Sequence, residues 1–258
     1  MRTEIIERAM PWIAVVLLFV VWEIACTVFA VPEFILPKPS QVARVLVTSA
    51  GPIWFHARET LITTLIGFGV SIGVGVLLGV AVGSSRLAYR SFYPMLVGFN
   101  SVPKVAIVPV LVVWFGIGFL PAVITAFLMS FFPIAVNVAT GLATVEPELE
   151  DVLRSLGAKK RDFILKVGLP RAMPYFFASL KVAVTLAFVG SVISESIASE
   201  KGIGTMMVQA SADFRIPLVF AGLLVTAAMG IGMYAIFAAI ERRMTGWATR
   251  RMDLEGMD

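Results

Sequence analysis

Charged residues are scarce in this chain of 258 residues, and their scarcity excludes a water-soluble globular domain. Asp, Glu, Lys and Arg make up 15% of the sequence, against roughly 25% in soluble domains. Hydrophobic residues make up 59%, and the mean hydropathy is +0.91. The composition therefore indicates an integral membrane protein.

Cysteine and histidine are almost absent, since Cys26 and His56 are single examples of their type. One Cys excludes an intramolecular disulfide and a cysteine metal cluster, and one His excludes a site built on several imidazoles. The phosphate-binding pattern Gly-x-x-x-x-Gly-Lys-Ser/Thr is also missing, so the chain does not bind ATP by that route. We expect no catalytic residue, metal or cofactor on this chain.

Six apolar runs approach the length of about 20 residues that crosses the hydrocarbon of a bilayer. They are residues 11–31, 61–83, 92–115, 120–142, 173–194 and 217–240. The sequence thus predicts an all-α, polytopic protein with about six transmembrane helices. The first run could instead be a signal peptide cleaved after Val28-Phe29-Ala30, but Glu4, Glu7 and Glu23 and the length of the run disfavour it.

Proline and small residues predict the shape of particular segments. Pro37-Lys38-Pro39-Ser40 predicts a stiff turn in which Ser40 caps a short amphipathic helix ending near Ser49. Pro94, Pro103 and Pro109 predict a kinked third span. In the second span small residues recur every four positions and predict a flat face for a neighbouring helix: Gly67, Ser71, Gly75, Gly79 and Gly83.

Lys and Arg are concentrated in the loops on the side of the termini, which predicts that this side is cytoplasmic. Those loops carry Arg2, Arg8, Arg86, Arg90, Arg154, Lys159, Lys160, Arg161, Lys166, Arg171, Arg242, Arg243, Arg250 and Arg251. The opposite side carries only Lys38, Arg44, Arg58, Lys201 and Arg215. We therefore expect a multi-pass protein of the cell (inner) membrane with both termini in the cytoplasm.

Few polar residues lie within the apolar runs, and three of them, Asn100, Lys104 and Asn137, are candidates for lining a translocation pathway. Lys104 either faces the pathway and attracts an anion or extends toward the cytoplasmic surface. For Lys181 the sequence favours extension toward the surface. Glu23 and Glu195 fall near the outer boundary, where we expect solvated carboxylates.

The polar loop 146–170 has the features of a docking element. Pro147 and the carboxylates around it predict the start of a short helix. Val152, Leu153 and Leu156 give this helix an apolar stripe, and Gly157 ends it in a sharp turn. A second short helix over residues 160–167 is expected to stop at Leu169-Pro170. The alternative is a solvated loop whose basic residues contact lipid head groups, which the apolar stripe disfavours.

Asp151-Val152-Leu153, Gly157 and Val167-Gly168-Leu169-Pro170 resemble the coupling motif of ABC importer permeases, which carries Glu-Ala-Ala, Gly and Ile-x-Leu-Pro at these intervals. The resemblance extends from about Thr60 to Arg242. Two stretches, Ser101-Val102-Pro103-Lys104-Val105-Ala106 and Ser199-Glu200-Lys201-Gly202-Ile203-Gly204, are similar to the nitrate/sulfonate/taurine branch.

The resemblance implies a type I ABC importer permease fold in three parts: residues 1–59, a permease core over 60–242, and a tail over 243–258. It implies that two permease copies, most simply a homodimer, form the pathway. Two cytoplasmic ATPases would bind the coupling residues Asp151, Val152, Leu153, Arg154, Leu156, Gly157, Ala158, Leu169 and Pro170. ATP would bind only those subunits, an extracytoplasmic protein would deliver the solute, and no nucleic acid would take part.

The implied solute is a small, anionic organic or inorganic molecule of the nitrate, sulfonate or taurine kind. The branch also includes permeases for pyrimidine precursors of thiamine, which remain an alternative. A stand-alone secondary transporter would share the apolar spans and buried lysines but would need no ATPase. A membrane enzyme lacks a catalytic set in this sequence.

Overall fold

The computed structural model describes the backbone of residues 2–145 and 147–255, and the side chains of residues 10–145, 148–149, 152–153, 155–159 and 161–245. Every regular element in these residues is helical. In chain order the longer helices are α1 (Arg2–Val28), α2 (Pro39–Thr48), α3 (Ala50–Gly83), α4 (Arg86–Asn100), α5 (Val108–Phe115), α6 (Phe119–Ala143), α7 (Pro147–Ser155), α9 (Leu169–Ala198), α10 (Ile203–Ala212) and α11 (Ile216–Glu255). Three short elements complete the chain: η1 (Lys104–Ile107), α8 (Lys160–Phe163) and η2 (Ile164–Gly168).

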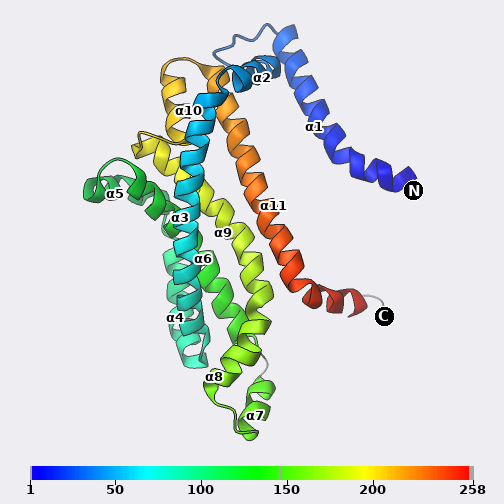
Figure 1. Ribbon diagram of the computed structural model, residues 1–258, viewed down its shortest axis with the longest axis vertical. Helices are drawn as coiled ribbons and strands as arrows, with labels where there is room; N and C mark the ends of the chain where they lie inside the picture. The colour runs from blue at the N-terminus through cyan, green and yellow to red at the C-terminus, as the bar shows by residue number, and fades with distance from the viewer. Residues whose placement is uncertain (1, 146, 256–258) are drawn as a thin grey trace.

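Within the part of the chain that the structure describes, five helices are long and apolar enough to cross a membrane, or six if the bent pair α4 and η1–α5 is one span. The pair is bent by 73° at Ser101–Pro103, as the proline spacing predicted. Figure 1 shows α7 and α8 at one end of the long axis and α10 at the other. These are called the α7 end and the α10 end below.

The core of the bundle is formed by α3, α6 and α9, with α11 along one side (Figure 1). Its buried side chains are aliphatic and aromatic, and include Phe68 of α3, Ile134 of α6 and Phe188 of α9. Polar pairs cross the same contacts: Ser71 bonds Ser130 at 2.5 Å, and Thr64 donates to Ser191 at 3.0 Å. The hydroxyls are therefore satisfied inside an apolar core.

The flat face predicted for the second span is confirmed, and α6 lies against it. A Cβ at Gly67, Gly75, Gly79 or Gly83 would come within 3 Å of atoms of α6. Only glycine permits backbones this close, so the spacing of small residues sets the distance between the two helices.

Several element boundaries differ from those predicted. Helix α3 begins at Ala50 and not near Leu61, and α9 runs from Leu169 to Ala198. The region expected to be a loop after residue 195 contains α10. Ser40 is not a helix cap: Lys38 is the N-cap, its N–H donates to Gln41 Oε1 at 2.8 Å, and Ser40 donates to the Glu23 carboxylate instead.

Helix α1 extends away from the bundle and meets it only near the α10 end (Figure 1). There, besides the Glu23–Ser40 bonds, the Trp22 ring lies 5.6 Å from the Phe220 ring of α11. A second apolar cluster joins α2, α10 and α11 through Val42, Met206 and Leu218. The α10 end is thus a small packed unit on top of the core.

Candidate functional site

The first half of the loop at the α7 end has the short helix and the sharp turn that the sequence predicted. Helix α7 covers Pro147–Ser155, and Gly157 follows with φ of +82°. The Ala158 N–H donates to the Leu153 carbonyl at 3.0 Å and closes the turn. Val152 and Leu156 are 55% and 77% exposed, and Leu153 is half-buried, so two of the three residues of the apolar stripe are exposed. Asp151 and Arg154 lie on the same helix, but their side chains are outside the described residues.

The second half of the loop differs from the prediction. Helix α8 does not stop at Leu169-Pro170; it passes through the π-helical turn η2 directly into α9. A proline inside a regular helix clashes with the carbonyl four residues earlier, and a wider π turn before Pro170 relieves that clash. Residues Arg161–Ala198 therefore form one helical stretch of 38 residues, with Leu169 half-buried and Pro170 exposed.

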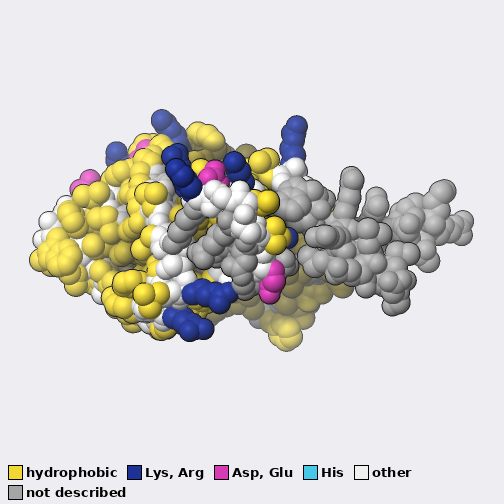
Figure 2. Space-filling view, turned by 90° about the horizontal axis from the view of Figure 1, so that it is seen from below, with side chains coloured by type: hydrophobic (Ala, Val, Ile, Leu, Met, Phe, Trp, Pro, Cys, Tyr) yellow, Lys and Arg dark blue, Asp and Glu magenta, His cyan; other side chains and the backbone are white. Residues whose placement is uncertain are grey.

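Lys and Arg side chains project from the α7 end around this loop (Figure 2). Asp162 accepts from the Lys159 N–H at 3.3 Å and forms an ion pair with Lys166 at 3.3 Å. The side chains of Lys159, Arg161, Lys166 and Arg171 are exposed. The α7 end thus presents an exposed apolar helix surrounded by positive charge.

Two of the three candidate pathway residues come together at the break between α4 and η1. The Lys104 ammonium donates to the Asn100 carbonyl at 2.7 Å and to Asn100 Oδ1 at 3.1 Å. It also lies 5.0 Å from the centre of the Phe132 ring of α6. Asn137 bonds within α6, donating to the Pro133 carbonyl at 2.8 Å.

A cavity of about 580 Å³ lies between α3, α4 and α6, and Phe132 is part of its wall. The lining is apolar, and four of its ten residues are aromatic: Phe92, Phe99, Phe131 and Phe132. Lys104 does not itself line the cavity, but its ammonium lies against Phe132, which does.

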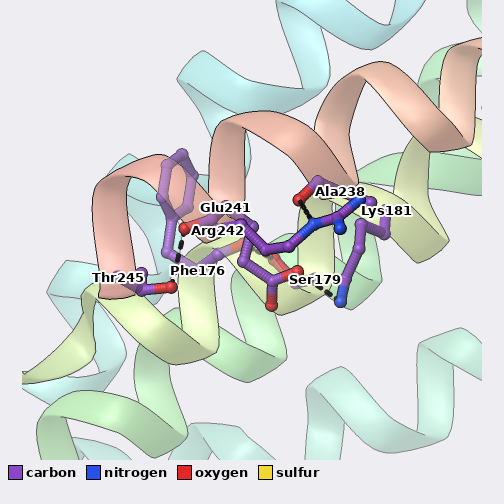
Figure 3. Close-up of polar contacts among 7 residues, drawn as sticks. All are labelled: Phe176, Ser179, Lys181, Ala238, Glu241, Arg242 and Thr245. Carbon is purple, nitrogen blue, oxygen red and sulfur yellow. Dashed lines mark hydrogen bonds and ion pairs between the residues drawn. The ribbon is translucent and has the colours of Figure 1, made fainter. Parts of the chain in front are cut away.

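The expectation that Lys181 extends to the surface is wrong. Its ammonium forms an ion pair with Glu241 of α11, and each side chain is only about one-fifth exposed. Figure 3 shows Lys181 of α9 reaching across to Glu241, beside Arg242 and Thr245 of α11. The apolar runs predicted from the sequence left Glu241 in a polar tail, where it was not expected to meet Lys181.

We expect the Lys181–Glu241 ion pair to affect stability mainly because removing one partner leaves the other charge unpaired in a partly buried position. Lys181→Met or Glu241→Gln should lower the free energy of unfolding by about 2–3 kcal/mol, whereas the double variant Lys181→Met/Glu241→Met should be close to the wild type. Thermal unfolding of the purified protein in detergent measures this. Equal losses in the single and double variants would contradict a paired interaction.

A cluster at the α10 end, which we call the Glu195 cluster, was not predicted from the sequence. It consists of Thr60 and Thr63 of α3, Glu195 of α9, and Gly202, Ile203 and Gly204 at the start of α10. Glu195 is 2% exposed and not solvated. Its carboxylate accepts from Thr60 Oγ1 at 2.8 Å, Thr63 Oγ1 at 3.2 Å and the Gly204 N–H at 3.3 Å.

Neighbouring backbone groups complete the cluster. The Ile203 N–H donates to Thr60 Oγ1 at 2.8 Å, and the Gly202 N–H donates to His56 Nδ1 at 3.1 Å. Two sequence signals lie here: a carboxylate directly after an apolar run, and the Gly202-x-Gly204 spacing. Neither identifies Thr60 or Thr63, which are far away along the chain.

Comparison with known proteins shows which family the chain belongs to. Residues 71–246 match the family described as binding-protein-dependent transport system inner membrane component. The formylaminopyrimidine transport permease ThiX of Halalkalibacterium halodurans is 29% identical, over 93% of this chain and 96% of the relative. The riboflavin transport permease RibX of Chloroflexus aurantiacus is 30% identical over 91% and 88%. The taurine transport permease TauC of Escherichia coli is 30% identical over 90% and 86%.

Among solved structures, a chain of the MetNI methionine ABC transporter superposes with a TM-score of 0.60 and 21% identity, over 79% of this chain and 97% of that chain. This likeness shows the fold of a type I importer permease. The chain belongs to the binding-protein-dependent inner membrane components, the permease subunits of ABC transporters.

Proposed function

We propose that the chain forms the translocation pathway of an ATP-driven importer for a small organic anion, and that the α7 loop receives the movement of a cytoplasmic ATPase. The observation that carries the proposal is the single helical stretch Arg161–Ala198. It begins beside the exposed apolar helix α7 and then packs through the core against α3 and α6. A displacement of α7 would therefore also move α9, which packs in the core of the bundle.

The proposed orientation places the α7 end in the cytoplasm. The loops at that end and the two terminal segments together carry most of the Lys and Arg residues, and a cytoplasmic excess of these residues sets the orientation of membrane proteins. Both termini are then cytoplasmic, and α2 and α10 face outward, where a solute-binding protein would dock.

The proposed assembly has two copies of this chain and two ATPase subunits. Val152, Leu153 and Leu156 would pack into a cleft of the ATPase, and Gly157 would provide the turn. Asp151 would pair there with a basic group, with Arg154, Ala158, Leu169 and Pro170 completing the contact region.

An anionic solute is favoured by Lys104, with Asn100 beside it, because its ammonium stands against the wall of the cavity between α3, α4 and α6. Asn137 is the third proposed pathway residue. The aromatic lining suits a solute with an apolar or planar body. A pyrimidine precursor of thiamine is the second candidate, since the aromatic wall would stack against a planar ring and ThiX is among the relatives.

Co-purification with an ATPase followed by uptake into proteoliposomes tests the proposal. The tagged chain should retain an ABC ATPase, and mass spectrometry of the partner binding protein should identify the ligand. Leu156→Asp should release the ATPase, because it places a charge in the apolar contact; Leu87→Asp, also on an exposed leucine, is the control. ATP-independent uptake by the chain alone would contradict the proposal.

Lys104→Met should reduce uptake of an anionic ligand by about tenfold, because one charge-assisted hydrogen bond is lost. Lys104→Arg should retain most of the activity. The measurement is initial uptake rate against external ligand concentration, with an uncharged analogue as the comparison. Unchanged rate and selectivity in Lys104→Met would contradict the role of Lys104 in favouring anions.

A further inference from the structure

The start of α10 depends on two other helices for its hydrogen bonds. The first N–H groups of a helix have no partner within the helix itself, and its N-cap, Gly202, has no side chain to cap them. The Ile203 N–H is satisfied by Thr60 of α3, and the Gly204 N–H by Glu195 of α9. The buried carboxylate also faces the positive end of the α10 dipole.

The Thr60 hydroxyl links the Ile203 N–H of α10 to the Glu195 carboxylate of α9. A hydroxyl has one hydrogen to donate and lone pairs to accept with. Thr60 accepts from the Ile203 N–H and has Glu195 Oε2 at 2.8 Å as its closest acceptor. A shift of α10 relative to α3 or α9 would therefore leave several buried polar groups unpaired at once, which is costly.

The backbone of residues 202–204 lies directly against α9. A Cβ at Gly202 would overlap the Glu195 carboxyl group, and a Cβ at Gly204 would overlap the Val192 carbonyl oxygen. Gly202 also has φ of +109°, which disfavours other residues. These glycines allow the close approach that the Glu195 bonds require.

Helix α9 joins this cluster to the α7 loop. At 1.5 Å per residue, the stretch Arg161–Ala198 is roughly 57 Å long. Glu195 is within the last turn of α9, and the α7 loop precedes its other end. Helix α10 in turn packs on α2 and α11 through Met206 and Ala210.

We infer that Glu195 is a positioning residue of the transport cycle: it ties the start of α10 to α9 and α3, so that the outer segment 199–212 follows α9 when the α7 end is displaced. The inference rests on the proposed function, in which an ATPase moves the α7 loop. The ligand pathway itself need not contact Glu195.

Uptake and ATP hydrolysis by the reconstituted importer separate this role from a purely structural one. Glu195→Ala and Glu195→Gln should lower uptake by about tenfold or more, while ATPase association and basal hydrolysis are retained, because the α7 loop is unchanged. Gly202→Ala should have the same effect with Glu195 still present. Glu200→Gln, which alters an exposed carboxylate nearby, is the control.

A distance measurement tests the coupling directly. Spin labels at Val189 of α9 and Val208 of α10, both exposed, are placed in a Cys26→Ala background. With Glu195 present, the distance within each copy should stay narrow and unchanged between the nucleotide-free and vanadate-trapped states. With Glu195→Ala it should broaden and differ between the two states.

The outcomes are distinct. A narrow, state-independent distance together with full uptake in Glu195→Ala would overturn the inference and leave the import function standing. Loss of ATPase association or of basal hydrolysis in both Glu195 variants would also overturn it, because the role would then be structural. A wild-type complex without ATP-driven uptake would overturn the import function and this inference together.

Discussion

Replacing Gly157 with proline is expected to abolish uptake while the protein still inserts into the membrane. Gly157 has φ of +82°, and the φ of proline is fixed near about −65°, so the turn after α7 cannot form. Among the described residues other than its two chain neighbours, no atom lies within 4 Å of a Cβ built at this position. The effect therefore comes from the backbone conformation and not from a steric clash.

A series at this position gives a graded test. Alanine in the left-handed region costs about 1–2 kcal/mol, and asparagine tolerates it better. Uptake should therefore fall in the order Gly, Asn, Ala, Pro, and ATPase association should fall in the same order. Membrane insertion and elution as a single folded species are the controls. Normal ATPase association and uptake in Gly157→Pro would contradict the assignment of this loop to ATPase coupling.

The α7 loop could be predicted because its signals are local. Helix start, apolar stripe and terminating glycine all lie close together in the sequence, and each has a direct physical reason. The continuation through η2 was not predictable in the same way. Pro170 normally indicates a helix boundary, but in the structure the π-helical turn η2 before it joins α8 to α9.

The Glu195 cluster could not be predicted because its members are far apart in sequence. Glu195 meets Thr60 and Thr63 across 135 and 132 positions of the chain. Taken by itself, a carboxylate near the outer boundary is expected to be solvated. Helix α10 was missed for the related reason that residues of α3 and α9 satisfy its first N–H groups, so no capping residue marks its start.

The glycine face of α3 could be predicted from the sequence only in part. A repeat of four residues indicates a close helix contact, but not which helix makes it. The structure identifies α6, and it separates the glycines that touch α6 from Gly69 and Gly73, where an added Cβ would have no atom within 4 Å. Sequence spacing alone predicted the face, and packing determines which positions are critical.

Gly79→Ala is therefore expected to destabilise the protein strongly, although the change adds only one methyl group. Its Cβ would lie 2.6 Å from Val138 Cβ and 2.8 Å from the Ala135 carbonyl oxygen. The carbonyl belongs to the α6 backbone, so relief requires the two helices to separate. Overpacking of this kind costs about 1–3 kcal/mol, and we expect the upper part of that range because two rigid atoms are involved.

Gly73→Ala is the matched control on the same helix. A Cβ there meets no atom within 4 Å, and alanine favours the helix over glycine by up to about 1 kcal/mol. Thermal unfolding in detergent should therefore show a lower midpoint for Gly79→Ala and an unchanged or higher midpoint for Gly73→Ala. Equal midpoints would mean that the distance between α3 and α6 is not set by Gly79. Since α6 also packs against α9, a wider α3–α6 spacing should reduce uptake in Gly79→Ala even where the folded protein is recovered.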